Sequence, residues 1–175
     1  MYRIPYKRYS FRVLFYAYEK LKMMMSIALS LHLLSAVIWV GGMFFAYVCL
    51  RPVAAQLLDP PVRFTLWSRV FTRFFNFVWP AIILLIVSGH GLISLNGGMS
   101  SVGKHVHIML ALGYLMFLLY GHLFFASFKR LKLAVAISDW EDAANRLNSM
   151  RKLIGINLSL GLITIVVASG GRFIF

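Results

Sequence analysis

The sequence predicts an all-α integral membrane protein, a four-helix bundle with a short outer turn and two basic cytoplasmic loops. Two observations carry this prediction. Hydrophobic residues make up 61% of the chain and charged residues only 13%, whereas soluble domains are usually about 45–50% apolar and about 25% charged. The apolar residues also gather in four uncharged stretches, each close to the roughly 20 residues that a helix needs to cross the hydrocarbon core.

The four spans are expected within a single membrane domain, residues 23–175, at residues 25–49, 74–95, 105–128 and 153–171. In lipid every backbone polar group must be paired internally, which only helices and closed barrels achieve. These stretches are too long and too continuous for barrel strands, so each is expected to be a helix. A polar turn, residues 96–101, joins the second span to the third.

Basic residues are expected to set the orientation. The loops before the second and fourth spans are rich in arginine and lysine, whereas the turn at residues 96–101 and the C-terminal end carry few. The positive-inside rule places both basic loops in the cytoplasm. We expect the protein in the bacterial inner membrane, with both termini in the periplasm. The net charge of +13 is attributed to this topology and not to nucleic-acid binding.

The N-terminal extension, residues 1–22, is also basic and disagrees with that orientation. It is expected either to be an interfacial amphipathic helix with its aromatic residues among the headgroups, or to follow from a mis-assigned start. Met23, Met24 and Met25 each offer a start codon, and we favour this second explanation. The long apolar run that follows does not resemble a secretory signal.

Several kinds of chemistry are excluded. All five acidic residues lie outside the apolar stretches, so paired-carboxylate catalysis within the membrane is not available. The single cysteine, Cys49, permits no intramolecular disulfide, and without a CxxCH motif there is no covalently attached c-type haem. The sequence therefore assigns no catalytic residue.

Histidines are the main candidates for function, because ionisable side chains inside a membrane are costly and mark functional sites. From the helical rise, His32 and His90 lie roughly 10 and 8 Å below the outer ends of the first two spans. His105 and His107 open the third span on the same side. Helical periodicity turns His32, His90 and His107 inward and leaves His105 at the rim.

Imidazole nitrogen and thioether sulfur are good ligands for copper, the thioether favouring Cu(I). The sequence therefore predicts a copper site in the outer leaflet, formed by His32, His90 and His107 with Met43 and Met109 as auxiliary ligands. An alternative is a b-type haem clamped by two of the imidazoles, because cofactors are commonly held between the helices of a bundle.

A second polar site is expected in the inner half of the membrane, where His122, Asn76 and Asn157 lie at comparable depth. It would be a quinone pocket, a further haem ligand or an interhelical hydrogen-bond network. We favour the network.

The residues resemble a known family. Residues 31–45, LHLLSAVIWVGGMFF, resemble the first span of CopD-like membrane proteins, which are associated with copper resistance or copper uptake. The motif HVHIM at residues 105–109 and the segment GINLSLG at residues 155–161 resemble a compact four-span branch of that family. The likeness covers most of residues 25–173 and implies a role connected with copper.

A weaker likeness connects the chain with HemJ-type protoporphyrinogen oxidases, four-span haem proteins that have a His followed by Trp and Gly at the spacing of His32, Trp39 and Gly42. This likeness implies a haem slot lined by Trp39 and Gly42, with His105 as a ligand. The family's lysine two residues after that histidine is His107 here, which argues against the oxidase activity but not against haem binding.

The function expected is therefore that of an inner-membrane protein that binds or handles copper at the His-lined site. One alternative is a b-type haem protein that transfers electrons or oxidises a porphyrin or quinol, and another is a cofactor-free accessory subunit. The expected partners are the lipid bilayer, a periplasmic copper protein or a quinone, and a second copy of the chain.

Overall fold

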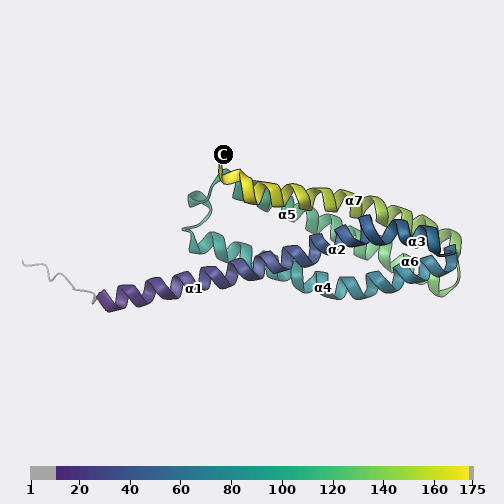
Figure 1. Cartoon of the computed structure of the whole chain (residues 1–175), viewed down its shortest axis with the longest axis horizontal. Helices are drawn as coiled ribbons and strands as arrows, with labels where there is room; N and C mark the ends of the chain where they lie inside the picture. The colour runs from purple at the N-terminus through teal and green to yellow at the C-terminus, as the bar shows by residue number, and fades with distance from the viewer. Residues whose placement is uncertain (1–10, 174–175) are drawn as a thin grey trace, which may run out of the picture.

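The computed structural model describes residues 11–173, and this part of the chain is helical with no strand. Residues 1–10 of the predicted N-terminal extension lie outside the described residues. The four long helices run antiparallel along the longest axis of the molecule (Figure 1). All four are long and apolar enough to cross a membrane, which confirms the predicted fold class.

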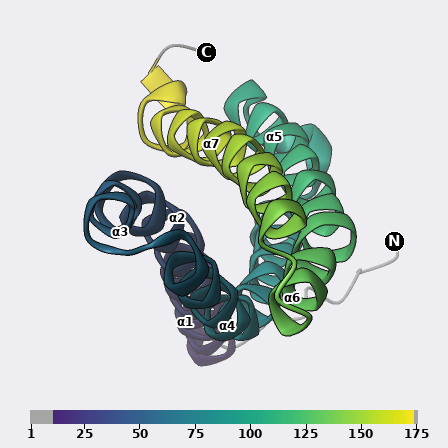
Figure 2. The same ribbon diagram turned by 90° about the vertical axis from the view of Figure 1, so that its right-hand side faces the viewer.

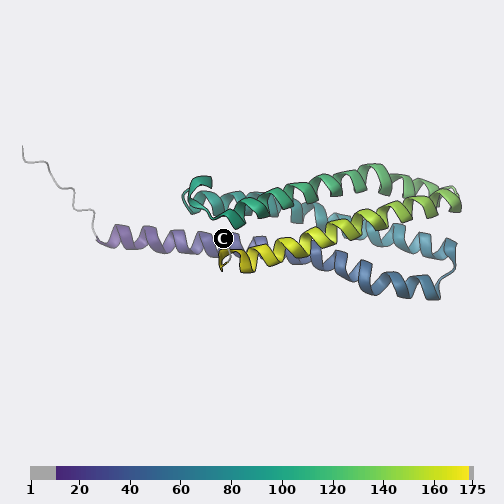
Figure 3. The same cartoon turned by 90° about the horizontal axis from the view of Figure 1, so that it is seen from above.

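The first long helix is composite, because three α-helical segments alternate with two stretches of wider π-helical turn. Its parts are α1 (Phe11–Ala36), η1 (Val37–Gly41), α2 (Gly42–Phe44), η2 (Phe45–Leu50) and α3 (Arg51–Leu57). Residues 12–22, the described part of the predicted extension, are exposed. They continue α1 in line with the span, and α1 projects past the other three helices (Figures 1 and 3).

The other three long helices are more regular. The second is α4 (Pro60–Leu95), and a short helix, η3 (Met99–Ser101), lies in the turn that follows it. The third consists of α5 (Lys104–His122), the π-helical η4 (Leu123–Phe128) and α6 (Lys129–Ala136). The fourth is α7 (Trp140–Gly170), which ends in η5 (Gly171–Phe173).

The two expected basic loops are corrected by the structure, because most of their residues are helical. Only residues 58–59 separate α3 from α4, and only residues 137–139 separate α6 from α7. Arginine, lysine, leucine and alanine are good helix formers, so the helices continue beyond the apolar runs. Pro60 and Pro61 occupy the first turn of α4, where proline is accepted. The Asp139 side chain caps α7 by accepting a hydrogen bond from the Asp142 N–H at 3.0 Å.

The four helices form two hairpins that pack against each other. In the first hairpin α1 lies along α4, and in the second α5 and α6 lie along α7. Aromatic rings fill the space between them, with Phe75 in edge contact with Tyr120 and Phe128 at centroid separations of 5.5 and 4.8 Å. The first and last long helices meet mainly in their middle part, and α3 and α7 stand apart in the end-on view (Figure 2).

The two ends of the bundle differ in their side chains and are named accordingly. The histidine end contains the turn at residues 96–103 and the C-terminal end of α7. The basic end contains the turns at residues 58–59 and 137–139. In Figure 1 the histidine end lies to the left and the basic end to the right.

Candidate functional site

His32 is half-buried on α1, and its ring lies against α4. Its Nδ1 atom is 2.9 Å from the hydroxyl oxygen of Ser88, which is buried. The Ser88 hydroxyl donates its only hydrogen to the carbonyl oxygen of Leu84, so it must accept from His32 Nδ1–H. We therefore infer the Nδ1–H tautomer, in which Nε2 carries the lone pair. The ring also has a backbone hydrogen bond to Leu85. Gly89 makes room for this ring, because a Cβ there would lie 3.2 Å from His32 Cε1.

His90, in contrast, uses both of its ring nitrogens. Nδ1 donates to the carbonyl oxygen of Ile86 at 2.9 Å. That fixes Nε2 as the acceptor, and the Tyr114 hydroxyl lies 3.2 Å from it. His90 thus joins α4 to α5 through Tyr114, and its lone pair is engaged.

The third span presents its histidines in the reverse of the expected order. His105 is half-buried and His107 is exposed. The ring of His105 folds back over Gly103, and its Cβ would be 2.6 Å from a Cβ placed on Gly171. The missing side chain of Gly171 therefore lets α5 and the end of α7 meet at His105, a contact that helical periodicity alone does not reveal. Met109, on the same helix, is half-buried.

The structure does not gather the predicted ligands into one cluster. His32 faces α4, His90 bonds Tyr114, and His107 is exposed. Within residues 11–173, no three or more His, Cys, Asp or Glu side chains form a group that could hold a metal ion. A copper ion at the histidine end would thus need a low coordination number or a thioether ligand.

A small cavity of about 20 Å³ lies between the helices in the middle of the bundle. Its lining includes Trp39, Met43, Phe75, Tyr120 and Asn157. The Tyr120 hydroxyl and the Asn157 carbonyl oxygen are buried there without a hydrogen-bond partner. A cavity of this size holds about one water molecule.

The predicted second polar site is thus only partly assembled. Asn157 is buried, whereas Asn76 and His122 are exposed. The buried face of α4 is instead formed by Phe71, Phe75, Val78, Ala81 and Ile82 among others. Polarity is a poor guide to the inward face of a membrane helix, because its lipid face is as apolar as its core. Tyr120, which the sequence reasoning missed, lies four residues from the buried Met116 on one helical face.

The space beside Gly42 bears on the haem alternative. A Cβ at Gly42 would overlap the ring of Phe74, so this glycine accommodates an aromatic side chain from α4. Trp39 is buried and stacks on Phe117 at 5.5 Å. These contacts leave no flat slot for a haem plane beside Gly42.

The wider turns of the first long helix could not be foreseen from its apolar sequence. Two π-helical stretches, η1 and η2, flank Met43. The N–H of Gly42 bonds to the carbonyls of both Ile38 and Trp39. Such stretches are frequent at functional sites of helices, and here they bring Trp39, Met43 and Ala46 to the interior.

Comparison with known proteins identifies the family. The family described as copper resistance protein D, CopD, matches residues 68–170, more than half of the chain. The match begins in α4 and ends with α7. No curated protein matches the chain, and no solved structure matches it. Together with the four membrane helices, the match shows that the chain belongs to the CopD family of copper-resistance-related membrane proteins.

Proposed function

We propose that this protein handles copper as a cargo in the membrane, with His32 as the ligand that receives Cu(I) at the histidine end. Family membership supports the choice of metal. The histidine end is the periplasmic end in the orientation expected from the basic residues. A periplasmic copper protein is the partner that this arrangement suits.

The observation that carries the proposal is the hydrogen bond of His32 Nδ1 to Ser88. Histidine ligands in metal sites usually donate their other ring N–H to an acceptor, which fixes the tautomer and orients the ring. Ser88 supplies that acceptor, and its own hydrogen is directed to Leu84. The His32 ring also has a backbone hydrogen bond to Leu85, and Nε2 is the nitrogen that we propose for the metal.

Met43 is the second residue in the proposal. It lies on the same long helix as His32 and lines the small cavity with Asn157 and Tyr120. Its thioether is buried, and thioether sulfur prefers Cu(I) to harder ions. The Tyr120 hydroxyl and the Asn157 carbonyl oxygen have no hydrogen-bond partner, so an ion in that cavity would give them a polar neighbour. His32 and Met43 thus offer an outer and an inner position for the same ion.

The test is Cu(I) affinity of the detergent-purified protein, measured by competition with a chromophoric Cu(I) chelator. His32→Gln is expected to weaken binding about tenfold or more, because it removes the imidazole nitrogen. Met43→Leu keeps the volume of the side chain and removes the sulfur. It is therefore expected to weaken Cu(I) binding with little change in the stability of the protein.

His122→Gln is the matched control, because His122 is exposed and lies near the C-terminal end of α5, away from the histidine end. It is expected to bind Cu(I) like the unmodified protein. Equal Cu(I) affinity in the unmodified, His32→Gln and His122→Gln proteins would overturn the proposal. So would an equal loss in the two histidine variants.

A further inference from the structure

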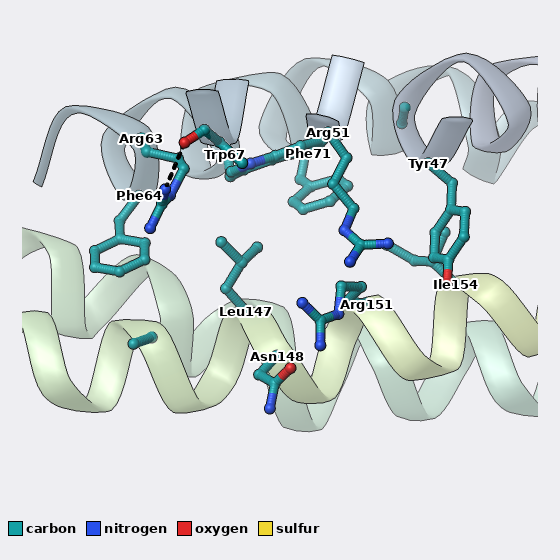
Figure 4. Close-up of a pocket in the computed structure, with 13 residues that line it drawn as sticks. Tyr47, Arg51, Arg63, Phe64, Trp67, Phe71, Leu147, Asn148, Arg151 and Ile154 are labelled. Carbon is teal, nitrogen blue, oxygen red and sulfur yellow. Dashed lines mark hydrogen bonds between the residues drawn. The ribbon is translucent and has the colours of Figure 1, made fainter. Parts of the chain in front are cut away.

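A larger cavity lies at the basic end, far from the histidines. Its volume is about 300 Å³, and it opens between the end of the first long helix, the start of α4 and the first half of α7. This is the part of the molecule where α3 and α7 stand apart (Figure 2). Its lining residues are shown in Figure 4.

Three arginines line the cavity, one from each of the three helices: Arg51, Arg63 and Arg151. Figure 4 shows Arg51 and Arg151 reaching toward each other from opposite walls. No aspartate or glutamate is among the lining residues. In the described part of the chain the one ion pair joins Arg146 to Asp142 at 3.0 Å, outside this cavity. Like charges that face each other are unfavourable, and an anion between them would reverse the sign of the interaction.

Two of these guanidinium groups are held in place by neutral neighbours. Arg51 lies over the ring of Tyr47, 5.2 Å from its centroid. Arg63 donates to the carbonyl oxygen of Ala55 at 3.3 Å and lies 5.7 Å from the ring centroid of Phe64. Cation–π contacts orient a guanidinium without neutralising it. The positive charges therefore remain available to a ligand.

The rest of the lining is apolar. Phe64, Trp67 and Phe71 line it from α4, and Leu147 and Ile154 line it from α7. Arg51 directly follows the apolar run that ends at residue 50, and Arg151 lies just before the run that begins at residue 153. The cavity thus lies where the apolar surface of the bundle ends, at the level of lipid headgroups.

We propose that this cavity binds an anionic phospholipid, with the phosphate between Arg51 and Arg151 and the apolar part of the lipid along Trp67 and Phe71. Arginine recognises phosphate through paired hydrogen bonds that a lysine cannot reproduce. Basic cavities between membrane helices are suited to anionic headgroups. The proposal does not depend on copper.

The experiment measures thermal unfolding of the delipidated, detergent-purified protein during titration with phosphatidylglycerol, phosphatidylcholine or inorganic phosphate. Phosphatidylglycerol is expected to raise the unfolding temperature at low concentrations and phosphatidylcholine is not. Inorganic phosphate is expected to have no effect at the concentrations where the lipid acts. If inorganic phosphate protects as well as phosphatidylglycerol does, the ligand is a soluble anion and the lipid assignment is overturned.

Arg51→Gln and Arg151→Gln are each expected to weaken the phosphatidylglycerol effect about tenfold, because each removes a charge-assisted contact. Arg69→Gln is the matched control, since Arg69 is exposed on α4 and outside the cavity. Arg51→Lys keeps the charge and tests the site if a glutamine variant fails to fold, and it is expected to bind more weakly than arginine. The proposal would be overturned if phosphatidylglycerol and phosphatidylcholine raised the unfolding temperature equally. It would also be overturned if phosphatidylglycerol raised the unfolding temperature of all variants equally.

Discussion

At the histidine end, polar side chains find partners on neighbouring helices, whereas at the basic end three arginines surround a cavity lined by no carboxylate. His32 bonds Ser88 and His90 bonds Tyr114, so the first end is held by contacts within the chain. Arg51 and Arg151 have no acidic neighbour in their cavity. We propose that the first end presents one imidazole nitrogen to copper and that the second receives a negative charge.

Between the two ends, the first and last long helices are in contact in the middle of the bundle. Gly161 makes that junction, because a Cβ there would lie 2.9 Å from Val40 and 3.2 Å from Met116. Gly161→Ala is expected to destabilise the fold by about 1–3 kcal/mol, since close-packed interiors resist added volume. Reversible denaturation in mixed detergent micelles measures this loss.

Gly113→Ala is the control for that measurement. A Cβ at Gly113 meets nothing within 4 Å, and alanine favours helix over glycine by about 1 kcal/mol. This variant is expected to be as stable as the unmodified protein or more so. Equal losses in the two alanine variants would mean that the contact at Gly161 does not join the helices.

The proposed anion site at the basic end is tested by placing a carboxylate in the cavity, which has none among its lining residues. Arg51→Asp places a negative group opposite Arg151, so it is expected to substitute for the ligand phosphate. The variant should keep its stability without anionic lipid and lose at least tenfold in its response to phosphatidylglycerol. Arg69→Asp, which lies outside the cavity, should still respond. A full response from Arg51→Asp would contradict the phosphate position.

The pairing at the histidine end is tested by removing the acceptor of His32. Ser88→Ala leaves the imidazole in place but frees its tautomer. It is expected to lower Cu(I) affinity roughly two- to tenfold, because a neutral hydrogen bond contributes about 0.5–1.5 kcal/mol net. Ser159→Ala removes a similar serine that is exposed and bonds the backbone of Gly155. If both serine variants bind Cu(I) equally, Ser88 does not position the ligand.

The fold was predictable because its determinants are coarse. Four long apolar stretches without charge require four helices in lipid, and the structure has them. The sequence predicts loops for the basic connections, because each lies between two uncharged stretches. Charge alone does not end a helix, and only Pro60 and the Ser138–Asp139 turn do so there.

The candidate site was less predictable, because it depends on which way each helix faces. His105 is half-buried in a contact with Gly171, which is distant in sequence, and His107 is exposed. Tyr120 and Asn157 meet at one cavity through helices that sequence periodicity cannot orient. The arginine cavity was unpredictable for the same reason. In the sequence its arginines belong to two separate basic segments that indicate only membrane orientation. The fold brings Arg51 and Arg151 to facing walls of one cavity.

The most direct test of the copper proposal is nitrogen NMR of the histidine rings in the detergent-solubilised protein, before and after addition of Cu(I). Before addition, His32 is expected as the Nδ1–H tautomer with an unprotonated Nε2. On addition of Cu(I), the Nε2 resonance of His32 should shift while both nitrogens of His90 stay in place. A His32 protonated on Nε2, or one whose resonances ignore Cu(I), would contradict the proposal that this residue receives the metal.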